Sequence, residues 1–196
     1  MEHPSPHEAA EGDNIEALES QLRECYGRVA YSHKTHEKCA DICIKKLRNI
    51  KRAQIILSAI TTGGLVIAIL GESNFSAVFA AITSTILLAL NTYTKEYDLG
   101  ELAQKYSNAA GDLWNMRESY LSLLIDIRNP KIDTSIIRTK RDQLQEALKN
   151  IYQAAPRTIS KGYSEAQKAL KVNEELTFSD QEIDEMLPPL LRKFRR

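Results

Sequence analysis

Two long apolar segments joined by a short polar connection dominate the pattern of hydrophobic and polar positions along the chain. Residues 53–70 are 18 residues without a charge, and residues 75–94 are another 20. At about 1.5 Å of rise per helical residue, each segment spans about 27–30 Å, the thickness of the hydrocarbon core of a bilayer. The connection GESN has one charged residue, Glu72. We therefore predict a tight hairpin of two transmembrane helices, the first arm (53–70) and the second arm (75–94).

The arms must be helical if they cross a bilayer, because lipid offers no hydrogen-bonding partner to the backbone and two strands cannot close a barrel. A helical hairpin buried in a soluble bundle is the competing interpretation, since the first arm is short for a span and both arms contain Ser and Thr. Seven basic residues lie between positions 33 and 52 and none in the connection, which favours the membrane, with both termini cytoplasmic. We expect the five residues nearest the first arm to anchor it at the membrane interface: Lys45, Lys46, Arg48, Lys51 and Arg52.

Apolar and small residues recur at intervals of three and four on both sides of the arms, which predicts long helices with one contact face. The series before the first arm follows an N-cap at Asn14 and consists of Ile15, Leu18, Leu22, Cys25, Val29, His36, Cys39, Cys43 and Ile50. Ser32 and Lys46 occupy core positions of this series, so either the partner surface is partly polar or the phase shifts to His33 and Leu47. The series after the second arm consists of Leu99, Leu102, Tyr106, Ala109, Leu113, Met116, Tyr120, Leu123 and Ile127.

No proline interrupts residues 18–70 or 75–127, so each arm is predicted to continue into its flanking helix without a break. A short connection makes the arms antiparallel neighbours, and their extensions then start side by side. We expect an all-α fold in which a two-transmembrane helical hairpin extends into a cytoplasmic antiparallel coiled coil or helical bundle.

Prolines and capping residues divide the rest of the chain. Residues 1–13 are polar and Pro-containing, which is typical of a disordered leader. Helices are predicted from Asp133 or Thr134 to Ala155 and over 157–172, where they can cover the hairpin as a four-helix bundle. Ser179 with Glu182 is a capping-box pattern for a short helix. The domain organisation is a leader at 1–13, a two-transmembrane domain at 14–155, and C-terminal helices at 156–196 with a basic tail suited to anionic lipid or to solvent.

Charge and cysteine content narrow the possible partners. The chain has 26 basic and 26 acidic residues, so no net charge indicates a nucleic-acid partner and we expect no direct nucleic-acid binding. Three cysteines on one predicted helix indicate free thiols in a reducing compartment. His36, Cys39 and Cys43 share a helix face, but one straight helix brings only two such side chains to the same ion, so a zinc site needs a second chain. We interpret them as packing residues and expect no metal and no cofactor.

Motifs for catalysis are missing from the sequence, so we do not expect an enzyme. There is no phosphate-binding G-x-x-x-x-G-K-[ST], no G-x-S-x-G and no H-E-x-x-H. No charge lies in the middle of either arm, which disfavours a proton relay or a charge-coupled transporter.

Small residues form one broad face of the second arm and a matching set in the first arm. The second-arm face comprises Ser76, Ala77, Ala80, Ala81, Ser84, Thr85 and Ala89. The first-arm counterparts include Ser58, Thr62, Gly63 and Gly64. Small faces let helices approach closely. Two uses remain open: packing within one hairpin, or assembly of a homo-oligomer in which a hydroxyl-bearing stripe faces sister subunits or lines a water path.

The arrangement of residues 26–153 resembles the SLATT domains, a family of two-transmembrane effectors associated with bacterial nucleotide-signalling and conflict systems. The resemblance rests on the basic helix KKLRNIKR before the first arm, the minimal turn GESN, and the long helix after the second arm. In that long helix it is carried by Leu102, Tyr106, Ala109, Ala110, Leu113 and Trp114. The resemblance implies that residues 14–155 form a SLATT-like domain.

The resemblance implies a membrane effector of anti-phage defence by abortive infection, which permeabilises the inner membrane when a sensor is triggered. No sensor domain is recognisable here, so we expect the sensor or signalling protein to be a partner encoded nearby. Because two helices cannot enclose a water path, this function requires homo-oligomers in contact with membrane lipid. The alternatives are a non-conducting scaffold that tethers a cytoplasmic partner through its coiled-coil helices, and a soluble bundle that inserts only when triggered.

Overall fold

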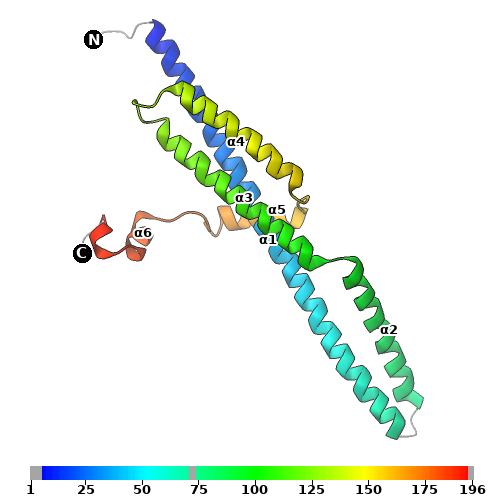
Figure 1. Ribbon diagram of the computed structural model, residues 1–196. Helices are drawn as coiled ribbons and strands as arrows, with labels where there is room; N and C mark the ends of the chain where they lie inside the picture. Colours follow the sequence, from blue (N-terminus) through cyan, green and yellow to red (C-terminus); the bar gives the residue numbers. More distant parts are fainter. Residues whose placement is uncertain (1–5, 71–73, 194–196) are drawn as a thin grey trace.

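The computed structural model describes residues 6–70 and 74–193, and every regular element in these ranges is helical (Figure 1). The elements are α1 (Pro6–Leu70), α2 (Asn74–Glu96), α3 (Leu99–Asp126), α4 (Thr134–Ala154), α5 (Ser160–Lys171), α6 (Asp180–Met186) and the short 3₁₀ helix η1 (Pro189–Leu191). The all-α prediction is confirmed. The start of the predicted leader (1–5), most of the predicted connection (71–73) and the end of the basic tail (194–196) lie outside the described residues.

Helix α1 has 65 residues and runs along the length of the molecule, through the first arm. At about 1.5 Å per residue it is about 100 Å long. It begins at Pro6, so residues 6–13, which we predicted to be disordered, belong to the helix. Pro6 suits a first helical position, because its φ is already helical and its missing N–H needs no partner there. Ala9 and Ala10 then favour helix propagation.

Helices α2 and α3 return along α1, which contacts α2 in the apolar hairpin and α3 in the part we call the helical bundle (residues 14–52 and 99–172) (Figure 1). One core cluster joins α1, α3 and α4 and contains Leu18, Leu22, Cys25, Val29, Leu113, Met116, Tyr120, Leu123 and Ile137. A second cluster, nearer the hairpin, contains Cys39, Ala40, Cys43, Ala103 and Tyr106. The two clusters are built mainly from the two predicted series, so these helices meet along the predicted faces.

The contact face of α1 shifts by one residue where the predicted series meets Ser32 and Lys46. His33 is 6 % exposed, and its Nδ1 lies 2.9 Å from the carbonyl oxygen of Ala110 on α3. Lys46 is exposed, whereas a Cβ on Gly100 would lie 3.6 Å from Cδ2 of Leu47. The structure therefore has the phase shift to His33 and Leu47, as expected because a helix of 3.6 residues per turn drifts about 20° per heptad.

The predicted continuity of the second arm with its following helix is wrong. Helix α2 ends at Glu96, and α3 begins at Leu99 after a cap at Asp98. The Asp98 carboxylate accepts a hydrogen bond from the Glu101 N–H at 2.8 Å, and the Leu99 N–H donates to the Tyr97 carbonyl instead of a carbonyl four residues back. An aspartate that caps a new helix competes with continuation of the old one. Only α1 connects bundle and hairpin without a break.

The C-terminal helices pack at different levels of the bundle (Figure 1). Helix α4, capped by Asp133, packs on α3 and buries Ile137, while α5 packs on α1 nearer the hairpin. The four predicted helices thus pack in two places: α1, α3 and α4 form a three-helix core at one end, and α5 covers a separate stretch of α1. Helix α6 lies apart from these helices (Figure 1). It starts with the predicted capping box of Ser179 and Glu182.

Candidate functional site in the apolar hairpin

Both arms expose large apolar side chains over most of their surface. Ile69 and Phe75 are 81 % and 80 % exposed, and Ile55 and Leu88 are 70 % and 66 % exposed. The most apolar 18-residue windows of the two helices have mean hydropathies of 1.3 and 1.7, and 0 % and 11 % of those windows are buried. A core helix of a soluble protein would be mostly buried. The exposed apolar surface therefore fits a lipid environment and does not fit the alternative of a hairpin buried in a soluble bundle.

Small and hydroxyl-bearing residues make the contacts between the arms. A Cβ on Gly64 of α1 would lie 3.5 Å from the Cβ of Ala80 and 3.9 Å from the carbonyl oxygen of Ser76 on α2. The hydroxyl oxygens of Thr61 and Thr83 lie 3.1 Å apart, and Thr83 is 5 % exposed. Close backbone approach with a shared hydroxyl contact is typical of helix pairs in membranes. These contacts fix the register of α2 along the first arm.

The predicted small-residue face of the second arm divides between two environments. Ser76 and Ala80 face α1, and Ala80 is 2 % exposed. The remaining members of the face are exposed on the outer surface of α2: Ala77, Ala81, Ser84, Thr85 and Ala89. The Thr85 hydroxyl donates to the carbonyl of Ala81 in its own helix at 2.9 Å, which satisfies it without a partner helix. Packing within the hairpin thus uses only part of the small surface.

A groove of about 830 Å³ runs along the bundle end of the hairpin. Its lining includes three of the predicted first-arm residues, Ser58, Thr62 and Gly63, together with Lys51, Gln54, Leu87 and Asn91. A Cβ on Gly63 would meet nothing within 4 Å, in contrast to neighbouring Gly64. The two adjacent glycines therefore serve different surfaces: Gly64 lies in the contact between the arms, and Gly63 lies in a groove whose lining mixes polar residues with apolar ones such as Ile55 and Ala59.

Polar and aromatic residues connect the arms where the hairpin meets the bundle. The Gln54 amide donates to Asn91 Oδ1 at 2.8 Å. The Lys46 ammonium donates to the Tyr93 hydroxyl at 2.6 Å and lies 5.0 Å from the centre of the Tyr93 ring. The centres of the Tyr93 and Tyr97 rings are 4.9 Å apart. Amphipathic rings and lysines are typical of the membrane–water interface.

The predicted basic anchor lies in the same zone of α1. All five of its residues are exposed: Lys45, Lys46, Arg48, Lys51 and Arg52. They follow the last buried residues of the bundle and precede the apolar side chains of the first arm. Basic side chains at the ends of membrane-spanning helices reach lipid headgroups, and such an anchor at this level of α1 stays a prediction.

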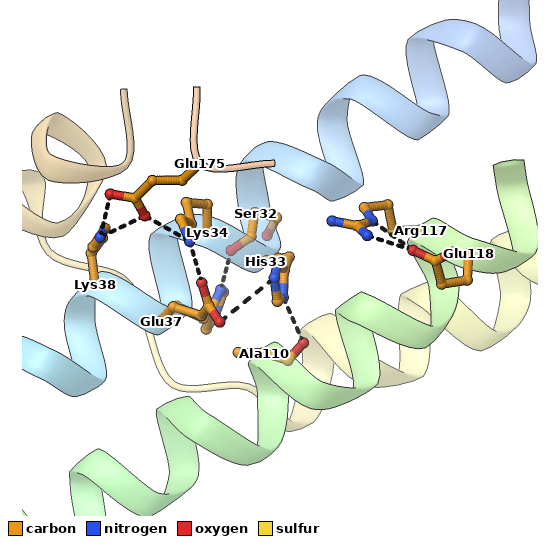
Figure 2. A network of polar contacts seen from close by, with 10 residues as sticks. Ser32, His33, Lys34, Glu37, Lys38, Ala110, Arg117, Glu118 and Glu175 are labelled. Atoms are coloured by element: carbon orange, nitrogen blue, oxygen red, sulfur yellow. Dashed lines mark hydrogen bonds and ion pairs between the residues drawn. The ribbon is translucent and has the colours of Figure 1, made fainter. Parts of the chain in front are cut away.

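A polar clamp holds the segment after α5 against α1 (Figure 2). The Glu175 carboxylate lies 2.9 Å from the Lys34 ammonium and 3.0 Å from that of Lys38, and Lys34 also pairs with Glu37 at 2.8 Å. Glu174 has a positive φ of 52°, and the next N–H, of Glu175, donates to the carbonyl of Ala169. Hydrogen bonds from Lys34, then Lys38, lower the pKa of Glu175 to about 2. The Glu175 carboxylate is therefore fully ionised at neutral pH and pairs with the two ammonium groups.

The cysteines and histidines that raised the question of a metal site are packing groups in this structure. Cys39 and Cys43 are 0 % and 6 % exposed, and burial raises the pKa of both thiols. In residues 6–70 and 74–193, no three His, Cys, Asp or Glu side chains lie close enough to hold a metal ion. His36 instead packs its ring 5.9 Å from that of Tyr106.

Sequence reasoning did not single out several residues that the structure brings into the hairpin contact. Thr83 lies outside the small-residue rows that the spacing emphasises, yet it is the buried hydroxyl between the arms. Gln54 and Asn91 pair with each other, although the spacing assigns neither of them a role. The sequence did contain a signal for this pair: each arm has one amide residue near its bundle end, and a short connection between antiparallel arms places such positions side by side.

Comparison with known proteins agrees with this architecture. No curated protein and no solved structure shows a significant match to the chain. The model of a protein family described as "SMODS and SLOG-associating 2TM effector domain family 4" matches residues 18–182. The match includes both arms and continues past the boundary expected at 155 to take in α5 and the start of α6. The exposed two-helix hairpin and this match, which covers most of the chain, establish that the protein belongs to the SLATT family of two-transmembrane effector domains.

Proposed function

We propose that the chain is the membrane effector of a bacterial anti-phage system of the abortive-infection type. It assembles into a homo-oligomer and permeabilises the inner membrane when a partner sensor is triggered. Membership of a family of SMODS- and SLOG-associating effector domains supports an effector role and a signalling partner encoded nearby.

The observation that carries the proposal is a groove that brings Lys, Gln, Asn, Ser and Thr side chains together on an otherwise apolar hairpin. Ser58, Thr62 and Gly63 face this groove, and the exposed small row of α2 lies outside the contact between the arms. A polar surface in lipid is costly unless it meets a partner or water. One hairpin cannot enclose a water path, so several copies must meet along these surfaces, with the hydroxyls facing either sister subunits or the path.

Orientation in the membrane follows from the basic residues of α1. Lys45 to Arg52 lie on the bundle side of the hairpin, which by the positive-inside rule supports a cytoplasmic position of the helical bundle and of both termini. A cytoplasmic partner then acts on the bundle. Helix α1 is the element that transmits a change of bundle packing to the first arm, because it continues through both without a break.

Membrane depolarisation in bacterial cells that express the chain with its cognate system tests this function. Gly63→Leu and Thr62→Leu fill the groove with apolar volume, and Ala81→Leu and Thr85→Leu fill the exposed small row. We expect at least one pair to reduce depolarisation while the protein still fractionates with membranes. Val78→Leu is the matched control, because Val78 is 60 % exposed on the lipid side and lies outside both surfaces.

Purified protein in liposomes separates the effector from a non-conducting tether. An effector with its trigger releases an entrapped small dye, and the groove variants release less. The tether would be established instead if the parent protein binds the activated partner but releases no dye in its presence.

A further inference from the structure

A cavity of about 970 Å³ opens in the helical bundle between α1, the end of α4 and the linker that leads to α5. The residues of interest in its lining are Gly27, Arg28, Tyr31 and His36 of α1, Arg157 of the linker and Tyr163 of α5. Its size falls at the upper end of the range of about 300–1,000 Å³ found for small-molecule sites. It is separate from the groove in the apolar hairpin, with which it shares no lining residue.

Aromatic rings form one wall of this cavity. The rings of Tyr31 and Tyr163 lie with their centres 5.7 Å apart and their planes tilted by 31°. Tyr163 is 52 % exposed, and Tyr152 at the end of α4 is 44 % exposed. Tyrosine rings with free area in a cavity can stack against a planar ring of a ligand.

Two guanidinium groups reach the same cavity. Arg28 pairs at 3.4 Å with Glu24, whose carboxylate side chain also belongs to the cavity lining, but both side chains are more than half exposed, so this ion pair is weak and exchangeable. Within the part of the chain that the structure describes, the guanidinium of Arg157 has no ion pair. Guanidinium groups bind carboxylates and phosphates with two parallel hydrogen bonds. The cavity therefore offers an anion a partner that has no other counter-charge.

Gly27 keeps the cavity open. A helical glycine costs about 1 kcal/mol relative to alanine. A Cβ on Gly27 would meet nothing within 4 Å, so no close packing in the described chain requires a glycine there. A larger side chain at this position would occupy the space that a ligand needs.

His36 is another residue of the cavity lining, and one of its ring nitrogens lacks a partner in the described chain. It is 3 % exposed, and its Nδ1 lies 2.8 Å from the carbonyl oxygen of Ser32. Its Nε2 is buried and has no hydrogen-bonding partner among the described residues. Buried polar atoms are ordinarily paired, but this atom is enclosed and does not open into the cavity, so the tyrosine rings and the guanidinium groups form the ligand surface.

We propose that this cavity binds a small ligand that combines a planar ring with an anionic group, either a phosphate or a carboxylate. The tyrosine wall takes the ring, and Arg157 with Arg28 takes the anion. Such a ligand contacts α1 and the linker together, and the linker is joined to α3 because the Tyr106 hydroxyl donates to the carbonyl of Arg157. The site does not depend on permeabilisation of the membrane: it gives the chain a ligand site of its own, in addition to any partner sensor.

Calorimetric titration of the full-length protein in lipid nanodiscs tests the proposal. One arm uses the 5′-monophosphates of adenosine, guanosine, cytidine and uridine, and the other uses indole-3-acetate, phenylacetate and 4-hydroxyphenylacetate. Each compound is compared with its uncharged ring and with inorganic phosphate or acetate. We expect at least one ring-plus-anion compound to bind about tenfold more tightly than either part alone, and the arm in which it falls identifies the anion.

Two variants assign the binding to this cavity. Gly27→Leu and Arg157→Ala should each weaken binding by about tenfold or more, while the melting temperature stays close to that of the parent. Gly111→Leu is the matched control: Gly111 is another glycine inside a helix whose Cβ would meet nothing within 4 Å, and it lies on α3 outside the cavity. The proposal is overturned if no compound of either arm binds the parent, or if both cavity variants bind as the parent does.

Discussion

Gly162 of α5 lies so close to Cys39 of α1 that a Cβ on Gly162 would collide with the Cys39 Sγ. The same Cβ would also lie 3.4 Å from the backbone nitrogen of Cys39 and from the carbonyl oxygen of Thr35. The sulfur can rotate, but the two backbone atoms cannot. Helix α5 therefore reaches this position on α1 because residue 162 has no side chain.

Gly162→Ala should loosen α5 from α1 and lower the free energy of unfolding by about 1–3 kcal/mol, the usual cost of overpacking. Cys39 is fully buried in the parent, and burial raises the pKa of its thiol, so both access and reactivity are low. Alkylation of Cys39, located by mass spectrometry, should become faster in the variant. Adding Cys39→Ala removes the sulfur and should restore part of the lost stability. Parent-like melting and labelling in Gly162→Ala would contradict the close contact.

The clamp on Glu175 predicts a specific pH dependence of stability. Its pKa is lowered from 4.5 to about 2 by hydrogen bonds from Lys34 and Lys38. A lowered folded-state pKa stabilises the fold above pH 4.5, and this contribution falls below that pH and is lost as the pH passes through about 2. Glu175→Gln should cost about 1 kcal/mol at pH 7, because Lys34 keeps Glu37 as a second partner.

The measurement is the melting temperature of parent and Glu175→Gln between pH 7 and pH 2. The difference should be largest at neutral pH and should shrink to a small remainder as the pH approaches 2. Glu174→Gln removes the same charge from the adjacent residue and serves as the control. A difference that is constant over the whole range would show that the carboxylate does not act through its charge.

The parts of this fold that the sequence predicts well are those that repeat locally. The series from Leu99 to Ile127 lies on the buried face of α3, because three- and four-residue spacing is a property of a single helix. The arms are recognisable because an uncharged run of bilayer length has few other uses. The capping box at Ser179 and Glu182 is equally local, and it too is confirmed.

The parts that sequence analysis missed depend on small local energies or on residues far apart in the chain. Asp98 breaks the second helix, but in the sequence it looks like any polar position on a helix, since a cap contributes only about 1 kcal/mol. The closeness of Gly162 to Cys39 has no periodic signal, and neither does the meeting of Arg157 with Gly27 at one cavity. Such contacts arise from how helices cross, which spacing along one helix does not specify.

The hydroxyl contact between Thr61 and Thr83 should contribute to the stability of the hairpin. A double-mutant cycle with Thr61→Val and Thr83→Val should give a coupling energy of about 0.6 kcal/mol, the average for side-chain hydrogen bonds between membrane helices. Reversible unfolding in mixed detergent micelles measures it. Thr61→Val combined with Thr85→Val is the control pair, because the Thr85 hydroxyl bonds within its own helix. A coupling of zero in the first pair would mean that the two hydroxyls do not interact in the micelle.

The break between α2 and α3 makes Asp98 a candidate hinge between the second arm and the bundle. In the broken form its carboxylate accepts the Glu101 N–H, whereas a continuous helix would lose this cap. Asp98→Ala removes the cap, which costs the broken form about 1 kcal/mol of stability. It also replaces aspartate by alanine, the residue with the highest helix propensity. Both effects favour a continuous α2–α3 helix.

We therefore expect Asp98→Ala to slow hydrogen exchange of the backbone amides from Tyr97 to Glu101 and to change the depolarisation response of cells that carry the cognate system. Asp98→Asn is the matched control, because asparagine caps helices as well as aspartate does and should leave both readouts like the parent. The pair separates the cap from the charge: if Asp98→Asn and Asp98→Ala change the response equally, the charge of Asp98 matters and the helix break does not. If neither exchange nor response changes in Asp98→Ala, residue 98 is not a hinge.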